Sequence, residues 1–172
     1  YLGGGFPEVY AEALAANRPM VEAVRRAVSS GMPTYAECGG LMYLSRGVRD
    51  LHGALHPMVG VVPAVARMLD RRAALGYVEV TALLDGPLSP RGEILRGHEF
   101  HWSELEWING HTPNAYLCTS ARGGPGRIEG YLRGRLLASY VHLHLASRPG
   151  TASRFLEFCA AAGGDGACSR AT

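Results

Sequence analysis

Apolar residues recur at helical spacing early in the chain, and glycines and prolines mark where each element ends. A helix is predicted over 7–16, because Pro7 suits a first helical turn. A second helix ends at Gly31, and a strand over 33–36 and another helix from Gly39 follow. The apolar face of the second helix consists of Met20, Val21, Val24, Ala27 and Val28.

Strand patterns dominate the rest of the chain. Residues 94–106 alternate polar and aromatic side chains, which predicts a strand or strand edge, whereas 52–74 shows no clear period and predicts loop and short pieces. A last helix is predicted over 155–162, before a small, polar tail at 163–172 that we expect to fray. The remaining predicted strands are 77–84, 116–120, 127–132 and 136–144. Strands that alternate with helices indicate an α/β fold.

Composition narrows the class of protein. The 172 residues are 47% hydrophobic and 19% charged with a net charge of +2, which fits one soluble domain and argues against a nucleic-acid surface. No apolar run is long enough to cross a membrane. Cys38, Cys118, Cys159 and Cys168 show no C-x-x-C spacing, so a reducing cytoplasm is expected. The chain begins without Met, and we expect residues 1–172 to be a single-domain fragment of a longer polypeptide.

Cys38 is the first candidate for chemistry. It lies between a predicted strand and a predicted helix, followed by Gly39 and Gly40, whose small size allows a tight bend around a nucleophile. The start of a helix also favours a thiolate over a thiol. The alternative is an inert, buried cysteine that only packs.

His142 and His144 form the second candidate group. In a strand, side chains two residues apart share a face, so both rings point to the same side. A cysteine nucleophile needs a base that takes its proton and later protonates the leaving group. We predict His142 as this base, with His144 or a backbone group orienting it; packed structural histidines are the alternative.

His98, Glu99 and His101 form a third polar cluster. We expect them to line a pocket for a zwitterionic substrate, with Glu99 holding an ammonium group and His101 or Ser103 a polar one. One alternative is a satisfied polar edge with Phe100 and Trp102 in the core. Another is a zinc site shared with the two later histidines, although no recognised ligand spacing is present, so no metal is predicted.

Glycines supply the last part of the predicted site. Acyl transfer through a thioester forms an oxyanion that needs two backbone N–H donors. Gly39 follows the nucleophile directly, and Gly4 or Gly5 is the predicted second donor; a merely flexible turn is the alternative. No phosphate-binding G-x-x-x-x-G-K-[ST] pattern occurs, so ATP chemistry is not expected within these residues.

Three patterns occur in a fixed order at 2–8 (LGGGFPE), 36–44 (AECGGLMYL) and 139–144 (SYVHLH). In this order they resemble the glutamine amidotransferase domain of the cobyrinic acid a,c-diamide synthases, a type shared with cobyric acid synthase. Residues 75–77 (LGY) and 97–101 (GHEFH) resemble intermediate motifs of that family. The likeness covers nearly the whole chain.

The resemblance implies a class I amidotransferase fold of flavodoxin-like type, with an open, mostly parallel sheet flanked by helices and added antiparallel strands. Cys38 would hydrolyse glutamine through a glutamyl thioester, with His142 as base and acid. The ammonia would pass to an N-terminal synthetase domain that uses Mg-ATP to amidate the a and c carboxylates of cobyrinic or hydrogenobyrinic acid. The implied partners are therefore glutamine, that domain and, through it, a corrinoid; a homodimer is left open.

One departure from the pattern concerns the group behind the base. Many class I amidotransferases carry Glu two residues after the catalytic His, where this chain has His144. We therefore predict a dyad or a triad with an unusual third member. The alternatives are a domain acting on a related tetrapyrrole, a stand-alone Cys-dependent α/β hydrolase and a non-catalytic binding module.

Overall fold

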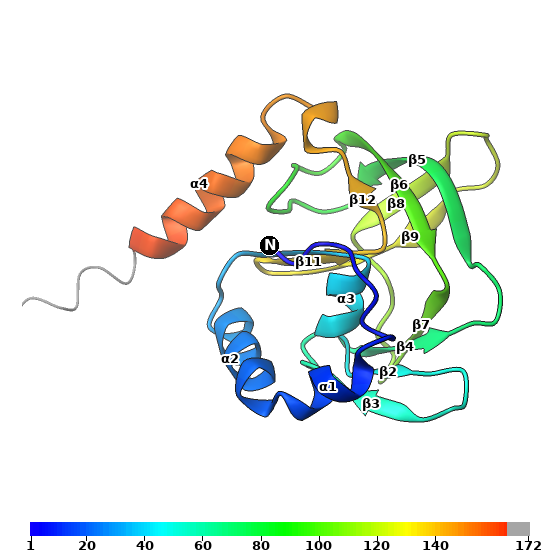
Figure 1. Cartoon of the computed structure of the whole chain (residues 1–172). Helices are drawn as coiled ribbons and strands as arrows, with labels where there is room; N and C mark the ends of the chain where they lie inside the picture. The colour runs from blue at the N-terminus through cyan, green and yellow to red at the C-terminus, as the bar shows by residue number, and fades with distance from the viewer. Residues whose placement is uncertain (165–172) are drawn as a thin grey trace, which may run out of the picture.

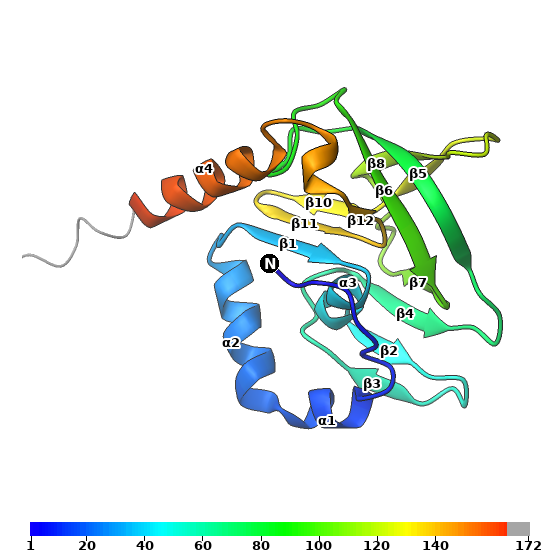
Figure 2. The same cartoon turned by 45° about the horizontal axis from the view of Figure 1, so that its top comes forward.

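A small central sheet separates the helices of the protein into two groups. The structure is a computed structural model, and it describes residues 1–164. Figures 1 and 2 show the central sheet with α4 on one side and the first three helices on the other. The helices are α1 (Ala11–Ala16), α2 (Arg18–Ser29), α3 (Gly39–Leu44), the 3-10 helix η1 (Leu145–Ser147) and α4 (Thr151–Gly164).

The strands form three sheets. They are β1 (Thr34–Glu37), β2 (Gly47–Arg49), β3 (Leu55–Pro57), β4 (Ala64–Met68), β5 (Ala74–Ala82), β6 (Ile94–His101), β7 (Ser103–Trp107), β8 (Tyr116–Ser120), β9 (Arg127–Glu129), β10 (Tyr131–Arg133), β11 (Leu136–Ser139) and β12 (His142–Leu143). The central sheet has the order β1-β11-β10, and the others have the orders β12-β6-β5-β8-β9 and β3-β2-β4-β7.

Alternating side chains divide the core into two clusters around the central sheet. On one face, Ala36 and Ala138 pack with Leu41 of α3. On the other, Tyr35 and Leu137 pack with the strands of the five-stranded sheet. The Tyr35 ring also meets Phe155 of α4, with ring centroids 6.5 Å apart. The central sheet is therefore buried on both faces, as expected of an α/β protein.

The α/β prediction is confirmed, but the sheets are mixed and not mostly parallel. Among residues 1–164, parallel strand pairing is limited to β1 with β11 and β2 with β4, plus a single bridge between Leu2 and Ala36. Strands joined by tight turns pair antiparallel, because only a long crossover returns a chain in the same direction. The five-stranded sheet is antiparallel throughout.

Several predicted boundaries were wrong. The first helix starts at Ala11, because 7–10 forms turns, and 52–74 holds β3, β4 and the start of β5. The strand predicted over 136–144 is broken: β11 ends at Ser139 in the central sheet, and β12 begins at His142 in the five-stranded sheet. The last helix reaches Gly164, while residues 165–172 of the tail, with Cys168, lie outside the described residues. No helix within 1–164 is long and apolar enough to cross a membrane.

Candidate active site

Cys38 lies in the sharp bend that joins β1 to α3. Its φ is 45° and its ψ is −102°, a backbone conformation that is strained for a residue with a Cβ. The surrounding structure holds it there, since the Cys38 N–H donates to the Ser139 carbonyl at the end of β11 over 2.8 Å. Such strain is found most often at functional sites.

The glycines after Cys38 allow the N-terminal segment to pack directly on the bend. A Cβ on Gly39 would lie 2.6 Å from the Gly5 carbonyl oxygen, and one on Gly40 would lie 2.5 Å from that of Leu2. A Cβ on Gly4 would overlap the His142 ring. The predicted oxyanion donors and the predicted base therefore surround the same bend as Cys38.

Replacing Gly39 by alanine tests this packing. We expect Gly39→Ala to destabilise the fold by about 1–3 kcal/mol, because the new Cβ meets backbone that has no alternative position. The control is Gly5→Ala, whose Cβ would meet nothing within 4 Å. Thermal unfolding measures both variants, and equal midpoints for the two would contradict the close approach.

His142 begins β12 and faces the bend. Its ring stacks on that of His98, the residue opposite it in β6, with centroids 4.8 Å apart. Cys38 Sγ lies 3.8 Å from the carbonyl oxygen of Phe100, farther along the same strand. The neighbouring Cys38 side chain is the largest of the influences that raise the pKa of His142 to about 9. The base is therefore protonated at neutral pH.

Glu37, the residue before Cys38, is the carboxylate beside the base. Its side chain is buried, and His142 Nδ1 lies 3.7 Å from Glu37 Oε2. Tyr1 donates to the same oxygen over 2.7 Å. Tyr35 donates to the other oxygen, which also accepts the Leu143 N–H over 3.0 Å. This carboxylate therefore fixes the start of β12 as well as the ring that it carries.

The charge of Glu37 is maintained by these donors. Burial alone would raise the pKa of Glu37, but the nearby His142 ring and the hydrogen bond from Tyr35, with smaller contributions from the other donors, hold it below its ordinary value. Glu37 in turn is the second largest cause of the raised pKa of His142. The pair is therefore a carboxylate and an imidazolium at neutral pH.

A pH profile tests the role of Glu37. If protonated His142 supplies the proton to the leaving group, turnover is present below about pH 9 and falls as the pH rises through that value. In Glu37→Gln the pKa of His142 falls, so we expect the alkaline limb to move down by about one pH unit. Glu79→Gln, at an exposed position, is the control. An unmoved alkaline limb in a folded Glu37→Gln protein would contradict the assignment.

His144 does not lie in the orienting position that the sequence predicted for it. Period-two alternation ends at Leu143, and His144 is exposed at the start of η1. Its backbone N–H donates to the Arg96 carbonyl over 3.0 Å. The structure places Glu37, from a distant part of the sequence, beside the base instead.

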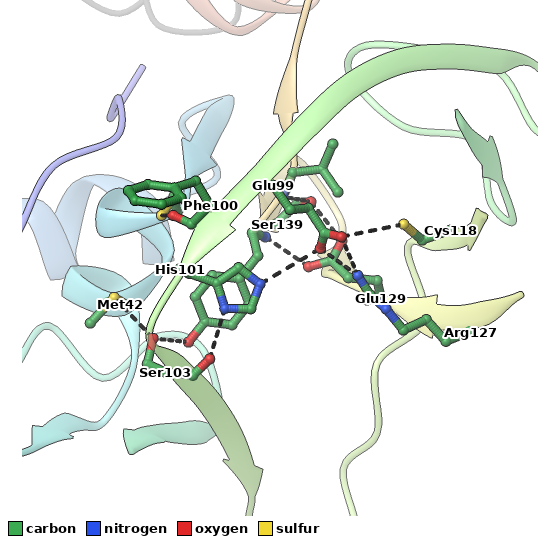
Figure 3. A network of polar contacts seen from close by, with 12 residues as sticks. Met42, Glu99, Phe100, His101, Ser103, Cys118, Arg127, Glu129 and Ser139 are labelled. Atoms are coloured by element: carbon green, nitrogen blue, oxygen red, sulfur yellow. Dashed lines mark hydrogen bonds and ion pairs between the residues drawn. The ribbon is translucent and has the colours of Figure 1, made fainter. Parts of the chain in front are cut away.

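The third predicted cluster is divided between two faces of β6. His98 and Phe100 are exposed, whereas Glu99 is buried on the opposite face; Figure 3 shows Glu99 and Phe100 on different sides of the strand. Arg127 donates to both oxygens of Glu99. His101 Nδ1 lies 2.8 Å from the Ser103 carbonyl oxygen, and His101 lines an open pocket of about 310 Å³. The predicted single pocket wall is therefore wrong, and Glu99 is already paired.

A second buried carboxylate fixes the chain where it changes sheets. Glu129 accepts the Tyr140 N–H over 2.7 Å and the Ser139 hydroxyl over 2.6 Å. The Ser139 carbonyl in turn accepts the Cys38 N–H, and His142 lies three residues after Ser139. The sequence analysis did not assign a role in the site to Glu37 or Glu129. The one signal in the sequence was that Glu37 directly precedes Cys38, the candidate nucleophile.

The other described thiols differ from Cys38. Burial, and then the nearby charge of Glu99, raise the pKa of Cys118 to about 12, so its thiol stays protonated. Cys159 lies on α4 and is partly exposed. Within residues 1–164, no three His, Cys, Asp or Glu side chains gather as a metal site.

Comparisons with known proteins show which sequences and folds this chain is similar to. Residues 1–150 match the sequence profile of the CobB/CobQ-like glutamine amidotransferase domain. The cobyrinate a,c-diamide synthase of Syntrophotalea carbinolica is 49% identical over 160 residues, which are 92% of this chain and 35% of that protein. That of Caldanaerobacter subterraneus subsp. tengcongensis is 43% identical over 164 residues, 95% of this chain and 36% of that protein.

A solved structure is also similar. A crystal structure of a glutamine amidotransferase superposes on 92% of this chain and 77% of its own, with a TM-score of 0.54 and 19% sequence identity. This likeness concerns the fold. The chain spans about a third of the length of the two curated relatives.

Proposed function

Because this chain belongs to the family of CobB/CobQ-like glutamine amidotransferase domains, we propose that it hydrolyses glutamine at Cys38 and supplies the ammonia for an amidation reaction. The observation that carries the proposal is the arrangement of Cys38, His142 and Glu37 at the bend after β1. A nucleophile, a base and a carboxylate behind that base form a unit suited to acyl transfer.

The first half of the reaction forms a thioester. Cys38 Sγ, its proton held by His142, attacks the side-chain amide carbon of glutamine, and the carbonyl oxygen becomes an oxyanion. Backbone N–H groups of Gly39 and of Gly4 or Gly5 are the proposed donors to this oxygen. The close packing of Gly5 on Gly39 supports this pairing of donors.

The second half releases both products. His142 gives its proton to the amide nitrogen, the C–N bond breaks, and ammonia leaves a glutamyl thioester on Cys38. Water then loses a proton to His142 and attacks the thioester carbon, which frees glutamate and restores the thiol. Glu37 keeps the ring in place and favours its protonated form during both steps.

The ammonia is proposed to amidate the a and c carboxylates of cobyrinic or hydrogenobyrinic acid. The curated relatives are named cobyrinate a,c-diamide synthases, and they are about three times as long as this chain. Carboxylates are commonly activated for amidation by ATP with magnesium, and the curated relatives carry about two thirds of their length outside the segment that matches this chain. We therefore assign that chemistry to the remaining portion of a longer synthase.

The test is a product balance in the full-length synthase. With glutamine, Mg-ATP and the corrinoid acid, we expect one glutamate for each amide formed. Asparagine is the control substrate, since its shorter side chain cannot reach Cys38 in the same pose. Hydrolysis of peptides or simple amides without hydrolysis of glutamine would favour a stand-alone hydrolase and contradict the proposal.

A further inference from the structure

The five-stranded sheet carries a row of rings that begins at the catalytic base. His142 lies opposite His98 in the register of β12 and β6, and His98 lies opposite Tyr77 in the register of β6 and β5. The rings of His142 and His98 are stacked with an interplanar angle of 11°. Three strands thus place three aromatic side chains in one line on the same face of the sheet.

A second, apolar row runs beside the first. Leu75 lies opposite Phe100, and the exposed Trp102 follows β6 directly. The exposed fractions are 61% for Leu75, 76% for Tyr77, and 41% for both Phe100 and Trp102. We call these four residues, together with His98, the aromatic face. The next pair along the strands, Glu79 and Arg96, is an exposed ion pair that gives the face a polar rim.

This pattern is the reverse of what an antiparallel sheet usually shows. One face of β5 and β6 already packs in the core through Val78, Val80 and Leu95. The other face is normally polar because it meets water. Large contiguous apolar side chains with a charged rim mark an interaction surface instead.

The position of the aromatic face relates it to the reaction. Its first row ends at His142, and Cys38 Sγ lies 3.8 Å from the backbone of Phe100. A partner seated on the face would therefore cover the place where ammonia is released. Covering is chemically useful, because ammonia that escapes to neutral water becomes ammonium, which has no lone pair for attack on an activated carboxylate.

We propose that the aromatic face is the docking surface for the ATP-dependent synthetase portion of the longer protein, an inference that rests on the proposed function. The curated relatives carry about two thirds of their length outside the segment that matches this chain, which is ample for such a domain. Exposed aromatic side chains are the residues that most often carry the binding energy of an interface.

The test uses the full-length synthase with the double substitution Leu75→Ser and Tyr77→Ser. Neither residue belongs to the catalytic group, so the glutaminase reaction itself should persist. We expect the amide formed per glutamate released to fall about fivefold or more, as for the loss of interface anchors. Amidation driven by added ammonium should change less than about twofold, since that reaction bypasses the interface.

The matched control is Leu156→Ser, an equally exposed leucine on α4. An unchanged ratio of amide to glutamate in the double variant would overturn the proposal. So would a raised KM for glutamine with an unchanged ratio, which would show that the face binds glutamine itself. Loss of a dimer with an unchanged ratio would assign the face to a second copy and overturn the proposal as well.

A failure of this inference can be told from a failure of the proposed function. Cys38→Ala is measured in parallel under the same conditions. If glutamine hydrolysis survives in that variant, the proposed function has failed. If it is lost while the double variant stays coupled, only the docking surface is refuted. Circular dichroism and thermal midpoints establish that each variant is folded.

Discussion

Cys38→Ala is expected to lose glutamine hydrolysis by a factor of about 10⁴ or more, because removing one member of a cooperating nucleophile and base disables the whole unit. The substitution keeps a Cβ at the strained φ of 45°, so it should change the stability of the bend little. Glutamate release followed by a coupled assay measures the loss. In the full-length synthase, amidation with added ammonium should remain.

The control for Cys38 is Cys159→Ala. Cys159 is a free, partly exposed thiol on α4 and takes no part in the proposed reaction. It should keep full activity, which would exclude a general effect of removing thiols. If the Cys38→Ala protein hydrolysed glutamine as fast as the unsubstituted protein, Cys38 could not be the nucleophile of any enzymatic reaction proposed for this chain.

His142→Ala is expected to lower turnover by about 10³-fold or more, since the proposed reaction uses His142 to take the thiol proton and return it to the leaving ammonia. His144→Ala should lower it less than about threefold, because that side chain is exposed outside the site. Single-turnover measurements of thioester formation separate the two variants most clearly. The reverse ranking would show that His144 is the base.

The His142 result also bears on Glu37. The carboxylate acts only through the ring, so in a protein that already lacks the ring, adding Glu37→Gln should cost little further activity. Independent, additive losses would indicate that Glu37 has a purely structural effect. This comparison needs only the two single variants and the double variant, with stability measured for each.

The strand, the bend and the helix around Cys38 could be predicted from the sequence because they are local. A cysteine followed by two glycines between a strand and a helix can be read from adjacent residues, and the structure has β1, the bend at Cys38 and α3 in that order. The glycines have the predicted role of allowing close backbone approach, although the contact partners, Leu2 and Gly5, come from a different segment.

The group behind the base could not be found in the same way. Alternation with period two pointed to His144, but that rule holds only while a strand continues. The chain leaves the central sheet after Ser139 and enters the five-stranded sheet for two residues. That strand, β12, ends before His144. Glu37 reaches His142 across more than 100 positions of sequence, through a contact that depends on how two sheets meet.

The polar cluster on β6 shows a similar limit. The alternation of side chains along β6 was predicted correctly. The face that is buried was not. Polar Glu99 would ordinarily face water and Phe100 the core. Arg127 from β9, an exposed residue, pairs with the buried Glu99, and this pairing reverses the expected sidedness and leaves Phe100 exposed near Cys38.

Covalent labelling tests most directly whether Cys38 is the nucleophile of a glutaminase. A glutamine-analogue diazo-ketone, which alkylates a nucleophile only when it is bound in the glutamine position, is incubated with the protein, and peptide mapping locates the adduct. We predict a single adduct on Cys38, slowed by added glutamine and absent in Cys38→Ala. No adduct on Cys38 in the folded, full-length synthase, or an adduct on Cys118 or Cys159 instead, would contradict the account.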